Sequence, residues 1–374
     1  MKAPSEYPPP VDPVEEFIGP PTDPEDERIE VGVAIVGGGQ AGLACAIRLL
    51  QLLEDDPALA ESLGEVPVAV LEKGKVAGAH QLSGAVMNPS AIRELYPDDD
   101  SWPHYGEVGG ESVYFMLNKK RSIPLWPVPP PFRNHGNYVI SVAELNRWLG
   151  EKAEEAGAYL LSETVGAKLL VENDRVVGVR TGDKGRDKEG GEKGNFEPGS
   201  DVTAKATVLA EGCWGHLTGA ALKGLDLAAK DPQVWALGVK EVWEVEQPLD
   251  TVIHTLGWPL RPQAKYKEFG GSWIYPMNRE GETPRVSIGF VAGLDWADAR
   301  LSPHDVLQEF KLHPRVRKIL EGGKRVGWGA KAIPEGGYWA MPTLHAPGML
   351  ITGDAAGMVN VPKLKGVHYA IKSG

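Results

Sequence analysis

The chain has 374 residues, of which 42% are hydrophobic and 24% charged, so it can form two domains of ordinary globular composition. Its 51 acidic and 39 basic residues give a net charge of -12, which argues against nucleic acid as a partner and disfavours loose adhesion to anionic lipid. The two cysteines, Cys45 and Cys213, lie far apart in sequence, so this chain alone assembles no dithiol site, iron–sulfur cluster or zinc site.

The first segment, residues 1–30, is rich in Pro, Asp and Glu, and this composition predicts a disordered acidic tail. It lacks the basic and apolar regions of a signal peptide. No run approaches the roughly 18 apolar residues of a membrane-spanning helix. We therefore expect no signal peptide and a compartment such as a cytosol.

The next segment predicts a strand, a glycine turn, a helix and a second strand. The strands are expected at Val31 to Val36 and Val66 to Glu72, and the helix runs from about Ala41 to Leu53. Because both strands are nearly all apolar, they should be buried on both faces, as in the parallel sheet of a βαβ unit.

The middle of the chain begins with a segment crowded with Pro and Trp, residues 102–132, which predicts a long, apolar, irregular loop. A helix, a hairpin, an exposed excursion and a strand are expected after it, over residues 142–156, 167–180, 182–200 and 206–210.

The last third predicts a second domain, because strands recur over residues 234–291 without a glycine fingerprint or long helices, which favours an antiparallel sheet. Ser302 is expected to cap a helix with Asp305 at its third position. A short strand at 349–352 and a final helix starting near Gly366 complete the expected elements.

A GxGxxG fingerprint lies directly after the first strand and before its helix. Gly37 permits the tight turn, Gly39 lets the backbone approach a pyrophosphate, and Gly42 lets helix and strand pack closely. Glu72, at the end of the second strand, stands where a carboxylate would accept both ribose hydroxyls of an adenosine. The fingerprint serves NAD and FAD alike.

A second signal, over residues 348–357, favours FAD: it is a strand that ends in Gly353-Asp354 and is followed by small residues. In FAD enzymes of the glutathione-reductase-like group, such a segment places the Asp carboxylate against the ribityl chain. The N-terminus of the helix near Gly366 could stabilise negative charge on the reduced flavin. The alternative is that Gly353-Asp354 is only a turn with a helix cap.

The segment 210–215, around Gly212, resembles the mid-chain strand and turn that closes over the nucleotide in related flavoproteins, although hydroxylases there usually read Gly-Asp-Gly and this chain reads Ala-Glu-Gly. No Ser–His–Asp order, HExxH pattern or P-loop is present, so we nominate no catalytic residue. His80 and His368 stand out among the histidines because they flank the flavin-binding segments.

Five separated segments resemble the electron-transfer-flavoprotein:ubiquinone oxidoreductase family, and the resemblance runs from about Val31 to Gly374. These segments are residues 78–85, 134–138, 210–217, 269–272 and 360–366. In that family, FAD takes electrons from reduced electron-transfer flavoprotein, a [4Fe–4S] cluster takes part in the relay, and ubiquinone is reduced at the membrane.

The resemblance implies an α/β fold: a glutathione-reductase-like, FAD-binding Rossmann domain with an inserted antiparallel-sheet quinone-binding domain. The FAD-binding domain is expected to be discontinuous, over residues 31–100, 136–232 and 325–374, with the ubiquinone-binding domain over 101–135 and 233–324. The expected FAD-binding residues are Gly37, Gly39, Gly42, Glu72, Lys73, His80, Leu82, Ser83, Gly84, Gly212, Asp354, Gly357 and Gly366.

The resemblance also implies that Gly270 and Gly271 contact the quinone head group through backbone atoms, since a flat ring can lie against a backbone without Cβ atoms. The alternative is a plain turn between strands. The residues that bind the [4Fe–4S] cluster in the family belong to a C-terminal ferredoxin-like domain, so we expect none in this chain. Val367 stands where the family often has Thr, which removes a hydroxyl from the flavin site.

The resemblance also implies peripheral membrane contact through Ala77 to Asp98, helped by residues 126–132. The apolar face would consist of Leu82, Val86, Met87, Ile92 and Leu95, and the alternative is that these residues belong to the core. The acidic N-terminal segment stands where mitochondrial members carry a targeting peptide, which favours the cytoplasmic face of a bacterial inner membrane.

Two rival functions remain open on the same fold. One is an FAD-dependent monooxygenase or prenyl reductase, and the other is an inactive nucleotide-binding fragment.

Overall fold

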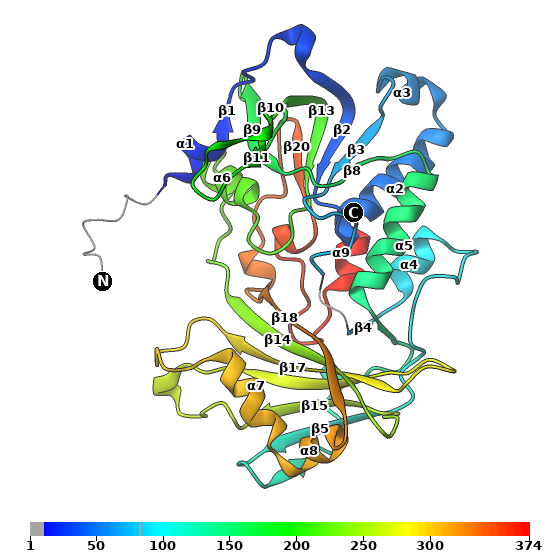
Figure 1. Ribbon diagram of the computed structural model, residues 1–374, viewed down its shortest axis with the longest axis vertical. Coiled ribbons are helices and arrows are strands. Elements are labelled where there is room, and N and C mark those ends of the chain that lie inside the picture. The colour runs from blue at the N-terminus through cyan, green and yellow to red at the C-terminus, as the bar shows by residue number, and fades with distance from the viewer. Residues whose placement is uncertain (1–10, 82–83) are drawn as a thin grey trace.

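The computed structural model describes residues 11–81 and 84–374 and places two large sheets one above the other, as Figure 1 shows. The first sheet has the strand order β1 (Ile18–Gly19), β9 (Gly166–Glu172), β10 (Arg175–Thr181), β13 (Asp201–Leu209), β2 (Ile29–Val36), β3 (Val68–Leu71) and β8 (Tyr159–Leu161). β20 (Met349–Ile351) pairs with the end of β13 and with β19 (His345–Ala346). β20, β13, β2, β3 and β8 are mutually parallel.

Helices cover both faces of this sheet, because the side chains of β2 alternate between two cores. Val33 and Ile35 pack with α2 (Gln40–Glu54), α4 (Ser90–Leu95), α5 (Val142–Glu155) and α9 (Val367–Ser373). Ala34 and Val36 pack on the other face with α6 (His216–Gly224). The βαβ unit expected from the apolar strands is therefore confirmed. The short α3 (Pro57–Ser62) connects α2 to β3.

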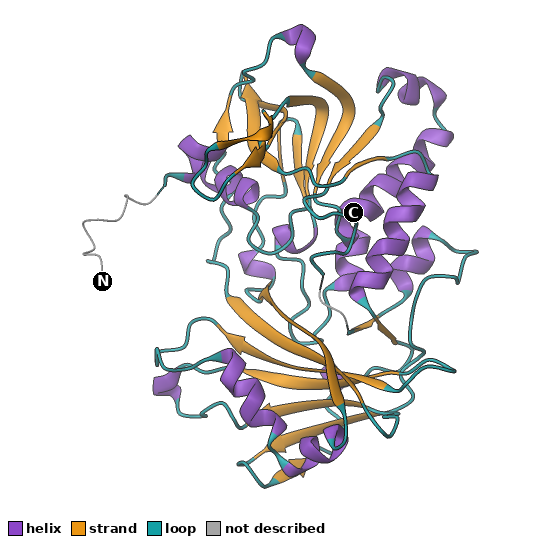
Figure 2. Ribbon diagram, in the orientation of Figure 1, coloured by secondary structure: helices purple, strands orange, loops and turns teal. Residues whose placement is uncertain are grey.

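The second sheet has the order β18 (Lys324–Pro334), β14 (Trp235–Glu244), β17 (Arg285–Gly293), β16 (Gly270–Met277), β15 (Val252–Gly257), β5 (Glu111–Met116) and β6 (Ser122–Pro124). Every pairing in it is antiparallel except β15 with β5, which is parallel. α7 (Pro303–Lys311) and α8 (Pro314–Leu320) cover its lower face, as Figure 2 shows. The expected cap of α7 is confirmed, since Ser302 Oγ accepts the Asp305 N–H at 3.3 Å.

Two expectations about the segments between the main elements were wrong. Residues 102–132 contain β5 and β6 instead of only irregular loop, because the proline of β6 lies in an edge strand, where a missing N–H is tolerated. The excursion at 182–200 is largely exposed, as expected, and it contains a hairpin of β11 (Lys184–Arg186) and β12 (Glu192–Glu197). β18, placed largely in the FAD-binding domain, pairs with β14 in the second sheet.

The remaining short elements connect the two sheets. β4 (Ala85–Met87) pairs with β7 (Tyr138–Ile140), on either side of the excursion to β5 and β6. Single 3₁₀ turns occur at η2 (Glu25–Glu27), η3 (Pro130–Phe132), η4 (Ala264–Tyr266), η5 (Tyr338–Ala340) and η6 (Gly353–Ala356).

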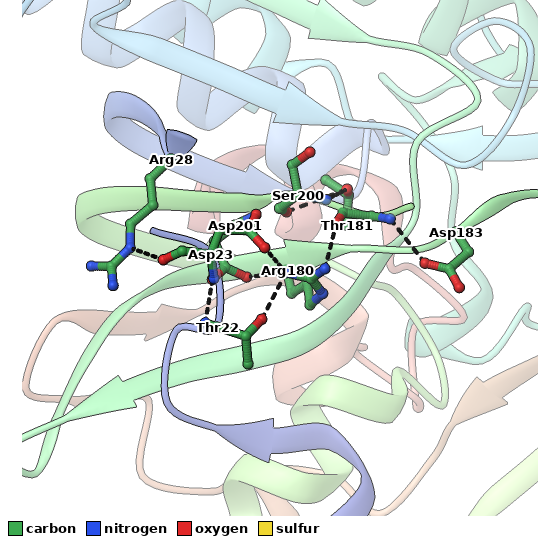
Figure 3. A network of polar contacts seen from close by, with 9 residues as sticks. Thr22, Asp23, Arg28, Arg180, Thr181, Asp183, Ser200 and Asp201 are labelled. Atoms are coloured by element: carbon green, nitrogen blue, oxygen red, sulfur yellow. Dashed lines mark hydrogen bonds and ion pairs between the residues drawn. The ribbon is translucent and has the colours of Figure 1, made fainter. Parts of the chain in front are cut away.

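Residues 11–30 are not a disordered tail. The Arg180 guanidinium on β10 bonds the carboxylates of Asp23 and Asp201, each at 2.7 Å, and Figure 3 shows the network around it. Asp201 is fully buried and also accepts the backbone N–H of Asp23 at 2.8 Å. α1 (Pro13–Phe17) precedes Asp23 in the chain and packs against α6. The acidic composition suggested disorder, but the Asp23 carboxylate has partners 157 and 178 residues away, Arg180 and the Asp201 N–H.

Candidate functional site

The glycine fingerprint forms the turn between β2 and α2. Gly37 has φ of +111°, and a Cβ there would lie 2.3 Å from the Ala210 carbonyl oxygen. A Cβ on Gly42 would lie 2.1 Å from the Gly37 carbonyl oxygen, so this position requires close packing of helix and turn. Gly39 differs, because the nearest atom to its Cβ would be Gln81 Nε2 at 3.6 Å, which leaves open space above the turn. This arrangement fits a pyrophosphate approaching the backbone at Gly39.

Two polar residues that the sequence did not single out support this turn. Asn146 on α5 is fully buried, and its Nδ2 donates to the Gly38 carbonyl oxygen at 2.6 Å. Gln40, the first residue of α2, lines the cavity described below, and its buried Nε2 has no hydrogen-bond partner in the part of the chain that the structure describes. An unpaired buried N–H donor beside this turn is satisfied by an oxygen acceptor such as a phosphate.

Glu72 lies at the carboxyl end of β3, beside the turn. Its Oε2 accepts the Gly38 N–H at 3.0 Å, and its Oε1 accepts the Gly74 N–H. His80 Nδ1 lies 3.9 Å from Oε1. The carboxylate is thus fixed where a ribose would lie if the pyrophosphate occupies the turn.

Asp354 lies in the 3₁₀ turn after β20. Burial raises the pKa of its carboxyl to about 6, although the positive charge of Lys331 opposes this shift. Among the described residues, nothing donates a hydrogen bond to the carboxylate. A partly buried, unpartnered acceptor of this kind fits the hydroxyl groups of a ribityl chain.

Glu211 and Gly212 follow β13. The Glu211 carboxylate accepts the N–H groups of Leu217 and Thr218, so it caps the start of α6. Gly212 has φ of +73° and turns the chain along the cavity wall. Glu211 therefore has a structural role that explains its presence without a ligand.

One cavity of about 610 Å³ joins these groups to the upper face of the second sheet. It brings together most of the expected residues, namely Gly37, Gly39, Glu72, Lys73, His80, Gly84, Gly212, Gly270, Gly271, Asp354 and Gly366. Gly42 and Gly357 do not line it: Gly42 packs behind the turn, and Gly357 faces Gln233. Leu82 and Ser83 lie outside the described residues.

Gly270 and Gly271 begin β16 at the floor of the cavity. Both are also required by the sheet, because a Cβ on Gly270 would lie 1.9 Å from the Val291 carbonyl oxygen and one on Gly271 would lie 2.6 Å from that of Thr255. Their place in the cavity is consistent with a quinone site, but their identity as glycine does not depend on one.

The floor also carries polar residues that the sequence analysis missed. Lys240 on β14 lines it, as does the pair His254 and Tyr275, whose Nε2 and hydroxyl oxygen lie 3.0 Å apart. Burial lowers the pKa of His254 to about 3, helped by the charge of Lys365. A sequence signal for such residues does exist, namely a polar side chain among the apolar residues of a strand. Such a side chain marks the face of the sheet that meets a cavity.

The apolar face expected for Ala77 to Asp98 was wrong. Val86, Met87, Ile92 and Leu95 are each at most 8% exposed, and the last three pack in the core beneath α2 and α5. Leu82, the fifth member, lies outside the described residues. Residues 126–132 differ, because Trp126 is 85% exposed.

The described residues include no helix long and apolar enough to cross a bilayer. They also include no group of three or more His, Cys, Asp and Glu side chains that could hold a metal ion. With only two cysteines in the sequence, the residues of this chain do not fit a [4Fe–4S] cluster, which takes four thiolates.

Known proteins share this fold. A geranylgeranyl bacteriochlorophyll reductase-like protein of Thermoplasma acidophilum superposes with a TM-score of 0.68 at 20% identity, over 92% of this chain and 76% of the other. The chondrochloren halogenase, described as a variant of FAD-dependent halogenases, superposes with a TM-score of 0.59 at 18% identity, over 92% and 72%. These likenesses confirm the expected α/β fold of the Rossmann type.

Sequence comparison gives the family. The family described as "ETF-QO, ubiquinone-binding" matches residues 235–333, which hold β14 to β18. The mitochondrial electron transfer flavoprotein-ubiquinone oxidoreductase of Caenorhabditis elegans is 41% identical over 94% of this chain and 59% of its own length. A probable enzyme of the same name from Acinetobacter baylyi is 39% identical over 94% and 61%. The chain belongs to the electron transfer flavoprotein-ubiquinone oxidoreductase family, and it spans a little over half the length of these relatives.

Proposed function

We propose that this chain is the FAD- and quinone-binding part of an electron-transfer-flavoprotein:ubiquinone oxidoreductase. The observation that carries the proposal is one continuous cavity, which runs from the glycine turn at Gly37 to β16 in the segment matched by the ubiquinone-binding family. A cofactor at one end of the cavity and an electron acceptor at the other would thus lie close together. Direct electron transfer between them requires such a short distance.

The residues of this chain would bind and orient the two molecules. Gly39 and Gln40 would hold the pyrophosphate of FAD, Glu72 the adenosine ribose, and Asp354 the ribityl hydroxyls. The segments at Gly84 and Gly366 line the cavity, Gly84 beside Ser287 of the second sheet and Gly366 beside Asp354, and the isoalloxazine would lie between them. Bound FAD supplies the capacity to accept electrons and to pass them to an acceptor.

The quinone would lie on the cavity floor, against the backbone of Gly270 and Gly271. The floor is largely apolar, with Val291 and Leu256 among its residues, and such a surface suits an uncharged ring. The proposal needs no nucleophile, since both steps move electrons. The [4Fe–4S] cluster of the family would belong to residues outside this chain, and the path proposed here does not pass through it.

We further propose that the lower edge of the second sheet contacts the membrane surface, at the cytoplasmic face of a bacterial inner membrane. Trp126 is joined there by Leu117, Ile123 and Leu312, all largely exposed. Arg315 at the start of α8 lies within 3.3 Å of Ser122 on β6, so the two elements share this edge. Exposed basic residues surround the apolar ones, namely Lys119, Lys120, Arg121, Arg315, Arg317 and Lys318.

The whole chain carries a charge of -12, but salt screens the interaction of a lipid head group with distant charges of the protein. A local patch of basic and apolar residues can therefore still bind anionic lipid. The patch replaces the segment Ala77 to Asp98 as the candidate membrane contact.

The experiment that tests the function asks which donor reduces the flavin of the FAD-loaded protein. Reduced electron-transfer flavoprotein should bleach the flavin absorption, and NADPH should not. Reduction by NADPH with consumption of oxygen would favour a monooxygenase or prenyl reductase. A chain that gains no flavin absorption after FAD is added would support an inactive nucleotide-binding fragment.

A further inference from the structure

Lys240 stands on the cavity floor on the central part of β14. Its cross-strand neighbours are Gly289 on β17 and Gly329 on β18, and Gly238 precedes it on the same face of β14. Three of its four nearest positions on this face are therefore glycines, and the fourth is Val242, which is apolar. No neighbour on the sheet floor can offer it a carboxylate.

The side chain is buried but not paired. Lys240 is 5% exposed, and in the part of the chain that the structure describes its Nζ has no hydrogen bond, ion pair or aromatic ring as a partner. A buried ammonium group without a partner is costly, because desolvation disfavours the charge. Burial accordingly lowers the pKa of Lys240 to about 7, and no neighbouring charge contributes to this shift.

None of the other titratable groups that line the cavity forms an ion pair with this ammonium group. On the floor these are His254 on β15, Tyr275 on β16, Lys331 on β18 and Glu335 directly after it. The opposite wall carries Glu72, Lys73, His80, Glu211, Cys213, His216 and Asp354. None of them is an ion-pair partner of Lys240, and His254 and Tyr275 bond each other.

The cavity floor beside Lys240 is lined by an aromatic ring and by glycine backbone. The Trp273 indole lies over Gly289, where any Cβ would be 2.2 Å from the ring. At Gly238 a Cβ would have no neighbour closer than 3.7 Å, so the protein's own packing does not require a glycine there. Val291 on β17 pairs with Gly238 on β14 and with Gly271 on β16, so these three residues form one row across the sheet. Lys240 lies in the next row on the same face, close to the proposed quinone contact at Gly271.

We propose that Lys240 is the proton donor for quinone reduction in this cavity, its ammonium group giving a proton to a carbonyl oxygen of the ring. This inference rests on the proposed function. Reduction of a quinone to a quinol takes two electrons, which reduced FAD supplies, and two protons. One N–H bond of Lys240 breaks as one O–H bond forms, water supplies the proton for the second carbonyl oxygen, and the neutral amine regains its proton from solvent.

The test uses the FAD-loaded protein, whose flavin is reduced photochemically without oxygen and then mixed with a short-chain ubiquinone in a stopped-flow instrument. In the wild type, the second-order rate of flavin reoxidation should fall as the pH rises through the pKa of Lys240, about 7. Lys240→Gln should lower the limiting rate roughly 100-fold. Lys240→Arg keeps the positive charge, but its guanidinium does not release a proton in this pH range. The rate of this variant should therefore be lower than that of the wild type and independent of pH from about 6 to 9.

Two further measurements separate proton donation from other roles. Titration with oxidised quinone, followed by the flavin spectrum, should give dissociation constants for both variants within about threefold of the wild type. Lys324→Gln, which changes an exposed lysine at the far end of β18, should reproduce the wild-type pH profile.

A wild-type pH profile in Lys240→Arg and Lys240→Gln would overturn the inference, and so would a loss of quinone affinity at an unchanged limiting rate. A wild-type protein that binds FAD, yet whose reduced flavin does not react with any quinone, would instead contradict the proposed function.

Discussion

Asn146 and Gly38 are 108 residues apart in sequence, yet the Asn146 amide donates to the Gly38 carbonyl oxygen at 2.6 Å in the interior. α5 thereby holds the middle residue of the turn that is expected to receive the pyrophosphate. A turn fixed in advance loses less entropy when the cofactor binds.

Asn146→Ala leaves this carbonyl oxygen buried without its donor. We expect a loss of about 1 to 3 kcal/mol in the free energy of unfolding. The dissociation constant of FAD, measured by quenching of flavin fluorescence, should rise about tenfold. Asn195→Ala, in the exposed hairpin, provides the matched control. Unchanged FAD affinity in a folded Asn146→Ala variant would mean that α5 does not support the turn.

Asp354 predicts a pH dependence of FAD binding. Burial raises the pKa of its carboxyl to about 6 in the ligand-free protein, so the group is largely protonated at pH 5 and ionised at pH 7. An ionised carboxylate accepts hydrogen bonds from ribityl hydroxyls more strongly than a protonated one. The dissociation constant of FAD should therefore fall by up to about tenfold as the pH rises from 5 to 7.

Asp354→Asn should abolish that pH dependence and bind FAD about as weakly as the wild type does at low pH. It should also stabilise the ligand-free protein at pH 7. A carboxyl whose pKa is raised by folding stabilises the native state less as the pH rises from its unfolded value, about 4, to its folded value. A variant that keeps the wild-type pH dependence would assign the effect to another group.

Gly238 offers a probe of the cavity floor that spares the sheet. Gly238→Val adds a side chain where the closest atom to Cβ is 3.7 Å away, so the protein should fold and bind FAD normally. The added methyl groups would occupy the cavity floor beside Lys240, in the cross-strand row of Val291 and Gly271, and we expect the KM for a short-chain ubiquinone to rise about tenfold or more. Gly327→Val on β18 is the control, because its Cβ also has 3.8 Å of space but lies outside the cavity. Equal KM values for both variants would place the quinone elsewhere.

The turn between β5 and β6 carries three basic residues, 119–121, and predicts membrane binding that weakens as salt is added. Replacing Lys119, Lys120 and Arg121 together by Gln should lower binding to vesicles with anionic lipid at least tenfold, since each basic residue near such a surface contributes about 1 kcal/mol. Cosedimentation measures the bound fraction. Trp328→Ser removes an exposed ring from β18, at the opposite edge of the sheet, and should leave binding unchanged.

The parts of the fold that depend on local patterns were predictable from sequence. The apolar runs of β2 and β3, the glycine turn between them and the cap at Ser302 each depend on neighbouring residues, and each was found as expected. The site glycines belong to the same class, because their spacing alone specifies the turn.

What the sequence could not reveal depends on distant partners. Asp23 looks like part of a solvated acidic segment until Arg180 and Asp201 are brought beside it by β10 and β13. Ile92 looks like part of an exposed apolar face until α4 packs against α9 and α2. Lys240 has no motif around it, and only the strand register sets it among glycines.

The account is tested most directly by anaerobic, single-turnover oxidation of the reduced, FAD-loaded protein. A short-chain ubiquinone should reoxidise the flavin with formation of one quinol per flavin, and much faster than dioxygen does at the same concentration. Rapid reoxidation by dioxygen together with inertness toward ubiquinone would contradict the assignment of the cavity to a quinone.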